Sequence, residues 1–386
     1  MEVIYADHAA TSPMHEEVIA AMMPYFQTNF GNPSSIHQIG RNARNAIDEA
    51  RLTAANALSV SRQSIVFTSG GTEAANMAII GYALANESRG KHIITTEIEH
   101  HAVLNACREL ERRGFDVTYL PVDESGRVSE RDVKKALRDD TILVSCMYAN
   151  NETGVIQPVE KIARYLRKHQ AAFHTDAVQA FGAIPIDLTK LKVDLLSVSA
   201  HKINGPKGIG FLYVKDGITL HPLFFGGEQE RKRRAGTENV AAIVGFAKAI
   251  ELSQRDMDEK KNRYEQLVDI LFETWTKLDV DFIVNGDRTK ALPHIVNVSF
   301  PGASVESLLT NFDLAGVCVS SGSACTAGTT RSSHVLVSMY GENDERVASA
   351  VRFSFGIGNT PEQIEELAKR TAPIVKRLQQ SEPFIR

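Results

Sequence analysis

Short apolar runs alternate with amphipathic stretches over the first 240 residues or so of this chain. The apolar runs predict buried strands at residues 65–68, 92–96, 117–122, 141–148, 172–176 and 194–199. Apolar residues at helical spacing predict helices between several of these strands, among them residues 41–58 and 100–113. Strands that alternate with helices in this way predict a mostly parallel sheet with helices on both faces.

The pattern changes after Asn239. Helical stretches run to about residue 278, and shorter predicted strands follow at residues 282–285, 294–300 and 350–355, with a helix near 305–312 and a last helix from Thr360. This mixture predicts a smaller α+β domain. We therefore expect a large α/β domain over residues 15–260 and a small α+β domain formed by residues 1–14 and 261–386.

Composition narrows the class of protein. The chain has 386 residues, 43% of them hydrophobic and 23% charged, which suffices for two domains and a large core. A net charge of −4 gives no electrostatic case for nucleic acid or a membrane as the main ligand. The sequence shows no signal peptide and no membrane-length apolar run, and its four cysteines form no C-x-x-C pair. We expect a cytoplasmic protein with reduced thiols and no metal site.

The strand at residues 194–199 leads into Ser199-Ala-His-Lys202. A lysine at the end of a buried strand is partly desolvated, which lowers the pKa of its amine and suits it to Schiff-base chemistry. The neighbouring hydroxyl and imidazole could hold a phosphate. Considered alone, a lysine at a strand exit is more often an ordinary surface residue, so the interpretation depends on the other parts of the site.

Two further stretches supply such parts. Gly70, Gly71 and Thr72 form a turn between a predicted strand and a helix, where backbone N–H groups can bind a phosphate, although many such turns serve packing alone. Asp176 ends a strand and could keep a pyridine nitrogen protonated, which would make the ring an electron sink. Its alternative role is helix capping. Gln179 could bind a phenolic oxygen of the same ring.

Other polar residues follow predicted strands or lie in loops. His100 could stack on a flat ring or move protons, and Asn151 lies in what could equally be a plain turn. With Asp176 and Lys202, they fall where parallel strands end, which is where such sheets bind ligands. The basic run 231–237 ends at Thr237 and suits a phosphate, although a run of this kind is usually a solvated face.

Small polar residues and glycines surround Cys325 in the segment 319–331. Such a loop leaves a thiol exposed, whereas Cys107 lies in a predicted helix and Cys146 in an apolar strand, and both are predicted to be core residues. Because no large apolar residue lies between Ser320 and Ser333, we expect the loop to be mobile without a partner. Mobility suits a nucleophile that collects a group at one place and delivers it at another.

Together, Ser199-Ala-His-Lys202 and Ser320-Ser-Gly-Ser-Ala-Cys325 resemble the motifs of cysteine desulfurases of the NifS/IscS kind, within the fold-type-I pyridoxal-phosphate enzymes of the class-V aminotransferase-like superfamily. The resemblance runs nearly end to end, from Tyr5 to Phe355. The Arg-x-Gly-His-His-Cys loop typical of the SufS-like group is not in the sequence.

The resemblance implies that L-cysteine gives up its sulfur to Cys325, leaving L-alanine and an enzyme persulfide that is passed to an acceptor for iron–sulfur cluster or tRNA thiolation pathways. It implies catalytic roles for Cys325, Lys202 and His100, with pyridoxal phosphate on Lys202. It also implies a homodimer with shared sites. By the same resemblance, Gly71, Thr72, Ser199 and His201 bind the cofactor phosphate, and Thr237 binds the phosphate in the partner subunit. His100 stacks on the ring, Asp176 pairs with the ring nitrogen, and Gln179 and Asn151 contact the ring oxygen side. Arg352, with Asn32 nearby, binds the substrate carboxylate.

The chain departs from the pattern of that group at three places. Thr329-Thr330-Arg331 replaces Leu-Glu-Pro, Glu228 stands where glycine is usual, and His8 stands where tyrosine or asparagine is frequent. We expect Arg331 to help dock an acidic or tRNA-bound acceptor. The acceptor itself could be an iron–sulfur scaffold, a tRNA-thiolating enzyme or a rhodanese-like carrier.

Two alternatives stay open at this point. One is a related class-V enzyme, such as a selenocysteine lyase or a transaminase, which would use Lys202 and Asp176 in the same way. The segment around Cys325 favours desulfuration. The other is a non-catalytic sulfur-transfer scaffold, against which the complete set of cofactor residues argues.

Overall fold

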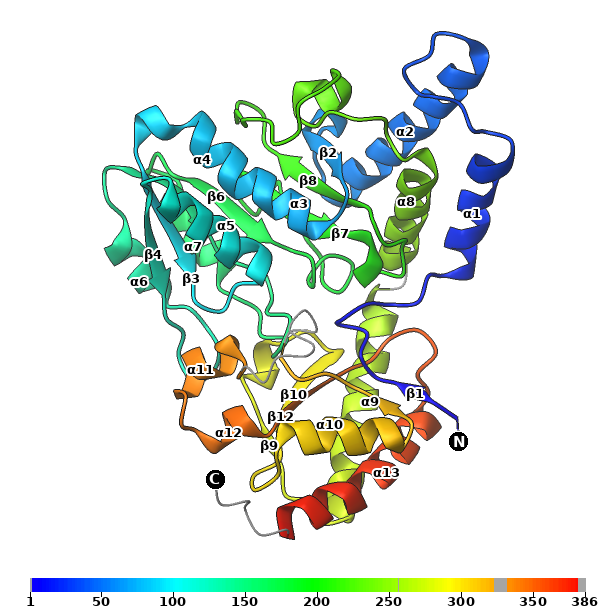
Figure 1. Cartoon of the computed structure of the whole chain (residues 1–386), viewed down its shortest axis with the longest axis vertical. Helices are drawn as coiled ribbons and strands as arrows, with labels where there is room; N and C mark the ends of the chain where they lie inside the picture. The colour runs from blue at the N-terminus through cyan, green and yellow to red at the C-terminus, as the bar shows by residue number, and fades with distance from the viewer. Residues whose placement is uncertain (1, 256, 323–331, 381–386) are drawn as a thin grey trace.

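The computed structural model describes residues 2–255, 257–322 and 332–380. In this part of the chain, seven strands form the central sheet in the order β2-β8-β7-β6-β5-β3-β4 (Figure 1). They are β2 (Ile65–Thr68), β3 (His92–Thr96), β4 (Asp116–Leu120), β5 (Thr141–Ser145), β6 (Ala172–Asp176), β7 (Leu195–Ser199) and β8 (Gly210–Val214). Neighbouring strands are parallel except at β8, which runs antiparallel to β2 and β7. The predicted mostly parallel sheet is confirmed.

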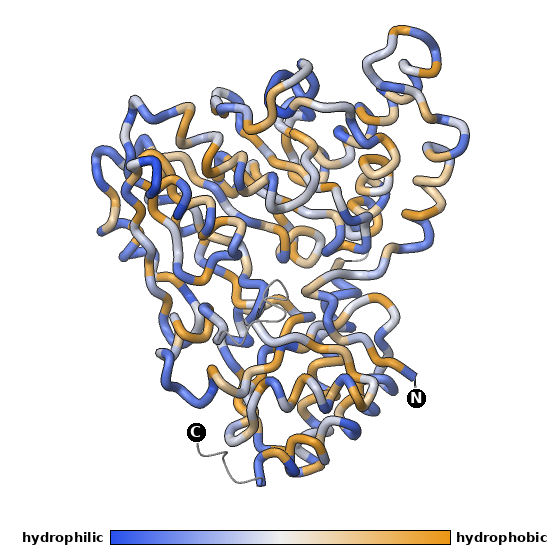
Figure 2. The backbone as a smooth tube through the Cα atoms, in the orientation of Figure 1, coloured by the Kyte–Doolittle hydropathy of each residue, from blue (hydrophilic) through white to orange (hydrophobic). Residues whose placement is uncertain are grey.

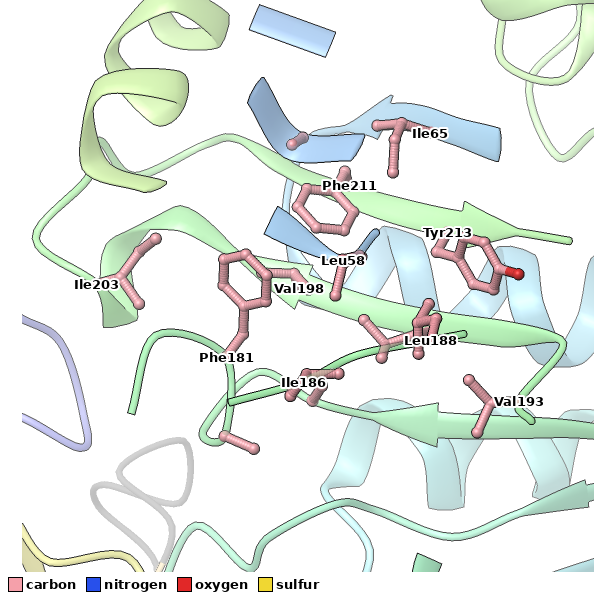
Figure 3. Close-up of a cluster of buried hydrophobic side chains, with 14 of the residues drawn as sticks. Leu58, Ile65, Phe181, Ile186, Leu188, Val193, Val198, Ile203, Phe211 and Tyr213 are labelled. Carbon is pink, nitrogen blue, oxygen red and sulfur yellow. The ribbon is translucent and has the colours of Figure 1, made fainter. Parts of the chain in front are cut away.

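Helices cover both faces of this sheet because neighbouring strand residues point to opposite sides. The helices are α2 (Gln38–Ala57), α3 (Gly71–Asn76), α4 (Tyr82–Ala85), α5 (His101–Arg112), α6 (Glu130–Ala136), α7 (Val159–Leu166) and α8 (Val240–Arg255). Ile93, Leu143 and Leu195 pack with the residues of α3 to α5. Ile94, Val144 and Leu196 pack in a second cluster with α2, α7 and α8. Figure 3 shows part of that second cluster, where Phe181, Val198 and Phe211 meet.

The remaining elements gather around a separate core. A sheet of order β12-β10-β9 combines β9 (Ile283–Val284), β10 (Ile295–Ser299) and β12 (Ala350–Ser354), while β1 (Ile4–Tyr5) pairs in parallel with β11 (Val317–Cys318). The long helices α9 (Met257–Lys277) and α13 (Pro361–Gln380) pack against each other, and α10 (Val305–Leu314), α11 (His334–Tyr340) and α12 (Glu345–Ala348) complete this part. The fully buried Trp275 lies in its centre and donates through Nε1 to Thr371 Oγ1 at 2.9 Å. Figure 2 shows hydrophobic positions along the strands and hydrophilic ones mostly on the outer loops.

Two helices begin at a capping hydroxyl. Ser129 accepts from the Asp132 N–H at the start of α6, and Thr360 accepts from the Gln363 N–H at the start of α13. Helix α1 (Glu16–Gln27) was not predicted. The division of the chain near residue 260 stays a prediction. Among the described residues, no helix combines the length and the apolar character that crossing a membrane requires.

Candidate active site

Lys202 lies in a short 3-10 turn (Ala200–Lys202) directly after β7, at the end of the sheet where the parallel strands finish. Its Nζ donates to the carbonyl oxygens of Ala9 at 2.5 Å and Ala10 at 2.7 Å. Gln179 donates through Nε2 to the Ala9 carbonyl as well, at 3.0 Å. The start of the chain therefore folds back over the sheet and holds both predicted cofactor residues.

Asp176 is the last residue of β6 and pairs with Ser197 of β7. Its side chain is 7% exposed, and its Oδ1 accepts from the Val178 N–H at 2.9 Å. Burial raises the pKa of this carboxyl to about 6, although the Val178 N–H and the charge of Lys202 act in the opposite direction. A cationic partner such as a protonated ring nitrogen would satisfy this buried carboxylate.

His100 is the N-cap residue of α5, and its Nδ1 accepts from the Ala102 N–H at 3.1 Å. In the neutral ring, this hydrogen bond leaves the proton on Nε2. Burial first, and the charge of Lys202 second, lower the pKa of His100 to about 4. The imidazole is therefore neutral near pH 7, which suits it to stacking on an aromatic ring and to donating one proton.

The turn from β2 to α3 forms a narrow cradle. Gly70 has a φ of +151°, and a Cβ on Gly71 would lie 2.8 Å from Val178 Cγ2 and 3.5 Å from Ser199 Cβ. Only glycines allow the backbone so close to Ser199 and Val178, and the first N–H groups of a helix have no intrahelical partner. A phosphate would fit these donors. Thr72 follows in α3, exposed to solvent.

His201 lies beside this corner, and its Nδ1 is 3.2 Å from Thr11 Oγ1. Burial, followed by the charges of Lys202 and Lys207, lowers the pKa of His201 to about 4. This ring is neutral near pH 7 and can offer one N–H to a phosphate. The expectation that Ser199 and His201 bind the cofactor phosphate stays a prediction.

Arg352 is 1% exposed in β12 and reaches the same region from the other core. Its Nη2 pairs with Asp7 Oδ1 at 2.8 Å, and its Nη1 donates to the carbonyl of Asn151 at 2.9 Å. The buried Nε has no hydrogen-bond partner among the described atoms. A guanidinium suits a carboxylate through its two-pronged geometry, and the binding of the substrate carboxylate by Arg352 stays a prediction.

Not every predicted residue joins this cluster. Asn32 is exposed in the loop between α1 and α2, where its Oδ1 accepts from the Ser34 N–H at 2.9 Å. Figure 1 draws that loop at the top of the view and β12 in the lower part, so one chain does not bring Asn32 next to Arg352. Thr237 is exposed in the connection that leads to α8.

Cys325, Gly328 and the departure at residues 329–331 lie outside the described residues. The predicted mobility of their loop and the docking role of Arg331 stay predictions. The other three cysteines are described: Cys107 and Cys146 are buried as predicted, and Cys318 is partly buried in β11.

Sequence reasoning missed several residues of the site. Asp7 holds Arg352, and the carbonyls of Ala9 and Ala10 hold Lys202, but no local pattern links the chain start to residues so far along the sequence. His8 also matters for packing. It is buried, burial lowers its pKa to about 4, and a Cβ on Gly356 would overlap its ring.

Pyridoxal phosphate fits the donors and acceptors of this site. A buried carboxylate faces a lysine amine across adjacent strand ends, a neutral imidazole is available to cover a ring, and a glycine cradle at a helix start can receive the phosphate. Arg352 adds a cationic edge for a carboxylate. Lys202, Asp176, His100 and Gly71 are therefore the residues that would hold the cofactor.

Comparisons with known proteins agree with this chemistry. The family "Aminotransferase class-V" matches residues 4–367. A protein of Bacillus subtilis (strain 168), provisionally named cysteine desulfurase IscS 1, is 59% identical over 378 residues, which is 98% of this chain and 100% of that protein. The "Cysteine desulfurase IscS" of Methanosarcina thermophila is 48% identical over 99% of this chain and 94% of its own length. A solved structure titled "NIFS-LIKE PROTEIN" superposes with a TM-score of 0.91 at 37% identity, covering 97% of this chain and all of that one.

Proposed function

This chain belongs to the class-V aminotransferase family and within it to the cysteine desulfurases of the NifS/IscS group, and from that premise we propose how its residues remove sulfur from L-cysteine. It is a pyridoxal-phosphate-dependent enzyme with the fold-type-I architecture. The observation that carries the residue assignment is the meeting of Lys202, Asp176 and His100 at one end of the central sheet, each close enough for the charge of Lys202 to act on the other two.

The cofactor is held at three points. Lys202 would attach it covalently, Asp176 would pair with its ring nitrogen, and the Gly71–Thr72 backbone with Ser199 and His201 would receive its phosphate. When bound, pyridoxal phosphate supplies an electron sink for the carbon next to the substrate carboxylate. Gln179 and Asn151 would contact the ring oxygen side, and His100 would stack on the ring.

The substrate is oriented by its carboxylate. Arg352 would bind it through its guanidinium, which Asp7 and the Asn151 carbonyl hold in place. The Lys202 amine would serve as the base that takes the proton from the α-carbon of bound L-cysteine, close to the neutral His100. We expect the proton to return to the substrate skeleton from the same face.

Sulfur transfer requires a nucleophile, which we assign to Cys325. Its thiolate attacks the sulfur of bound cysteine, an S–S bond forms as the C–S bond breaks, and the electron pair of the C–S bond stays on the carbon skeleton. That skeleton takes up protons and leaves as L-alanine. The enzyme keeps a persulfide on Cys325 for transfer to an acceptor.

We also propose the sulfur acceptor, the oligomeric state and the cellular location of the enzyme. We propose a homodimer in which Thr237 completes the phosphate site of the partner, and in which Asn32 serves near the substrate carboxylate. The acceptor is a protein, such as an iron–sulfur scaffold, a tRNA-thiolating enzyme or a rhodanese-like carrier, and neither nucleic acid nor a membrane is bound directly. We place the enzyme in the cytoplasm.

Exposed apolar side chains support the proposed dimer. Ile19, Phe26 and Ile36 are exposed in and after α1, and Phe225, in the same connection as Thr237, is 80% exposed. Covering such side chains with a partner removes apolar surface from water, which would favour the proposed dimer. For the domains, we propose residues 15–260 and, as a second unit, residues 1–14 with 261–386, because α8 packs on α1 and α2 whereas α9 packs on α13.

The test of the assignment compares two cysteine variants. Cys325→Ser should bind pyridoxal phosphate, judged by visible absorbance, and bind L-cysteine, but release no sulfide. Cys318→Ser should keep sulfide release, because that partly buried thiol lies in β11 and burial raises its pKa. Persulfide trapped by alkylation on Cys318, or sulfide release by Cys325→Ser, would contradict the proposed mechanism.

A further inference from the structure

Glu152 is fully buried in the turn that follows β5. Burying a carboxylate costs free energy unless other groups pair with it. Its Oε2 accepts a short hydrogen bond from the Ser333 hydroxyl. The same oxygen is 3.4 Å from the position of a Cβ on Gly322. A single carboxylate therefore lies against residues 322 and 333, and in the sequence Cys325 stands between them.

A second carboxylate holds the chain just before Gly322. Asp7 Oδ2 accepts from the Ser320 hydroxyl at 2.7 Å, while Asp7 Oδ1 pairs with Arg352. The Arg352 N–H donates to the Ser320 carbonyl at 2.7 Å, so residue 320 is also fixed to β12 by its backbone. Position 320 is therefore set by the residue that we assign to the substrate carboxylate.

The turn that carries Glu152 is itself fixed to the site. The Asn150 side chain accepts from the N–H groups of Glu152 at 2.8 Å and Thr153 at 2.9 Å. The carbonyl of Asn151 accepts from Arg352 Nη1, and the carbonyl of Glu152 accepts from Asn297 Nδ2 at 3.3 Å. Glu152 cannot move without disturbing contacts to Arg352, which makes it a rigid reference point between substrate and Ser333.

We propose that Glu152 is a positioning residue for sulfur transfer: its carboxylate fixes Ser333 by a hydrogen bond and packs beside Gly322, and these two residues stand on either side of Cys325 in the sequence. This inference rests on the proposed function. Holding two chain ends at one point reduces the volume that the residues between them can sample, and a displacement of about 1 Å at a reacting centre can cost about 100-fold in rate. The second oxygen, Oε1, is buried without a described partner, a burial cost that a purely structural role does not explain.

The test uses two serines that both cap helices. Ser333 accepts from the Leu336 N–H at the start of α11, and Ser304 accepts from the Ser307 N–H at the start of α10. Ser333→Ala loses a cap and the contact with Glu152, whereas Ser304→Ala loses a cap alone. We measure kcat and KM for sulfide release from L-cysteine by the holoenzyme, the persulfide trapped on Cys325, and the melting temperature.

For Ser333→Ala we expect kcat and trapped persulfide to fall by roughly 10- to 100-fold, with KM and visible cofactor absorbance close to wild type. Ser304→Ala should lower the melting temperature about as much as Ser333→Ala does, but should keep the wild-type kcat. Ser333→Thr retains the hydroxyl and should recover most of kcat. Glu152→Ala should lower kcat as much as Ser333→Ala, and the double variant should fall no further.

Two outcomes overturn the inference: equal kcat in Ser333→Ala and Ser304→Ala, or full additivity of the Glu152 and Ser333 substitutions. A different result would overturn the proposed function instead. If the wild-type holoenzyme binds L-cysteine but neither releases sulfide nor forms a persulfide, desulfuration itself fails.

Discussion

At the scale of single residues, Lys202 depends on a surface that the start of the chain supplies. The carbonyls of Ala9 and Ala10 accept from its amine, and Asp176 and His100 lie within the reach of its charge. A lysine held in this way is pre-positioned to react with an aldehyde at one point. The same contacts show why the nearby Lys207, which is exposed, is not equivalent.

Lys202→Ala should abolish the visible absorbance of covalently bound cofactor and lower turnover by roughly 10⁴-fold or more, since the attachment point and the base are both lost. Lys207→Ala is the matched control and should keep both. Absorbance spectra and sulfide release are measured on the same preparations. Full turnover by Lys202→Ala would refute the assignment of the site.

Asp176 gives a pH prediction. Burial raises its pKa to about 6 in the protein without cofactor, so the carboxyl is ionised above that pH and protonated below it. Only the ionised form pairs with a protonated ring nitrogen, and the affinity for the cofactor should therefore fall as pH drops from 7 to 5. Asp176→Asn should lower the affinity for the cofactor at pH 7 by roughly 10- to 150-fold, which corresponds to the free energy of one hydrogen bond to a charged group.

The pH series is a titration of apoprotein with pyridoxal phosphate, followed by absorbance. The phosphate of the cofactor also titrates near pH 6, so the difference between wild type and Asp176→Asn isolates the carboxyl. Parallel pH curves for the two proteins would show that Asp176 does not face the ring nitrogen.

At this scale, the residues that follow strands could be predicted and their partners could not. Asp176 ends a predicted strand, and Lys202 and His100 follow predicted strands within a few residues, and parallel strands bring their ends together. Asp7 and Glu152 carry no such local signal. Their contacts join residues more than 150 positions apart, and only the folded chain brings them together.

At the scale of elements, an unusual turn contacts β2, the strand that leads into the glycine cradle. Glu230, Arg231 and Lys232 all have left-handed backbone, with φ of 46°, 57° and 66°. Three consecutive residues in this region are costly unless the surroundings fix them. The buried Glu230 carboxylate does so: it pairs with Arg51 of α2 at 2.6 Å and accepts from the N–H of Phe67 in β2 at 3.1 Å.

Removing that charge should therefore be severe. Glu230→Gln leaves the Arg51 guanidinium buried without its ion pair, and we expect a loss of about 3–5 kcal/mol in the free energy of unfolding. Glu228→Gln is the control in the same turn, since Glu228 pairs with Lys232 between highly exposed side chains and should change stability by less than about 0.5 kcal/mol. Urea unfolding monitored by the fluorescence of the single tryptophan would measure both. A loss for Glu230→Gln no larger than the control would contradict the role of this pair.

Element boundaries follow from the sequence to different degrees. Strands β2, β3 and β6 have the predicted bounds, because strands buried on both faces are continuous runs of mostly apolar residues between turn residues. In β5 the ladder ends at Ser145 although the apolar run continues to residue 148, since the chain leaves the sheet to form the turn that carries Glu152. Helix α1 escaped prediction because Pro24 interrupts it and its apolar residues are partly exposed.

At the scale of the whole molecule, the residues of the proposed active site come from both cores. Lys202 and Asp176 belong to the central sheet, whereas Arg352 comes from the sheet that packs around Trp275. Contacts through Asp7 and Asn151 connect them within one chain. Thr237 is different, because it lies exposed in the connection between β8 and α8, in which Phe225 is exposed as well. In the proposed homodimer, the second copy of the chain would cover both residues.

Subunit mixing distinguishes a shared site from a site built by one chain. Thr237→Glu places a negative charge where a phosphate should bind, and Lys202→Ala removes the attachment point, so each homodimer should be inactive. In a mixed dimer, the Lys202→Ala chain supplies an intact Thr237 to the partner that retains its lysine. After unfolding and refolding of an equal mixture with cofactor, about a quarter of wild-type activity should return, because half of the dimers are mixed and each has one complete site. If Thr237 served its own chain, neither site of a mixed dimer would be complete and no activity would return; refolded wild type, treated in the same way, sets the scale.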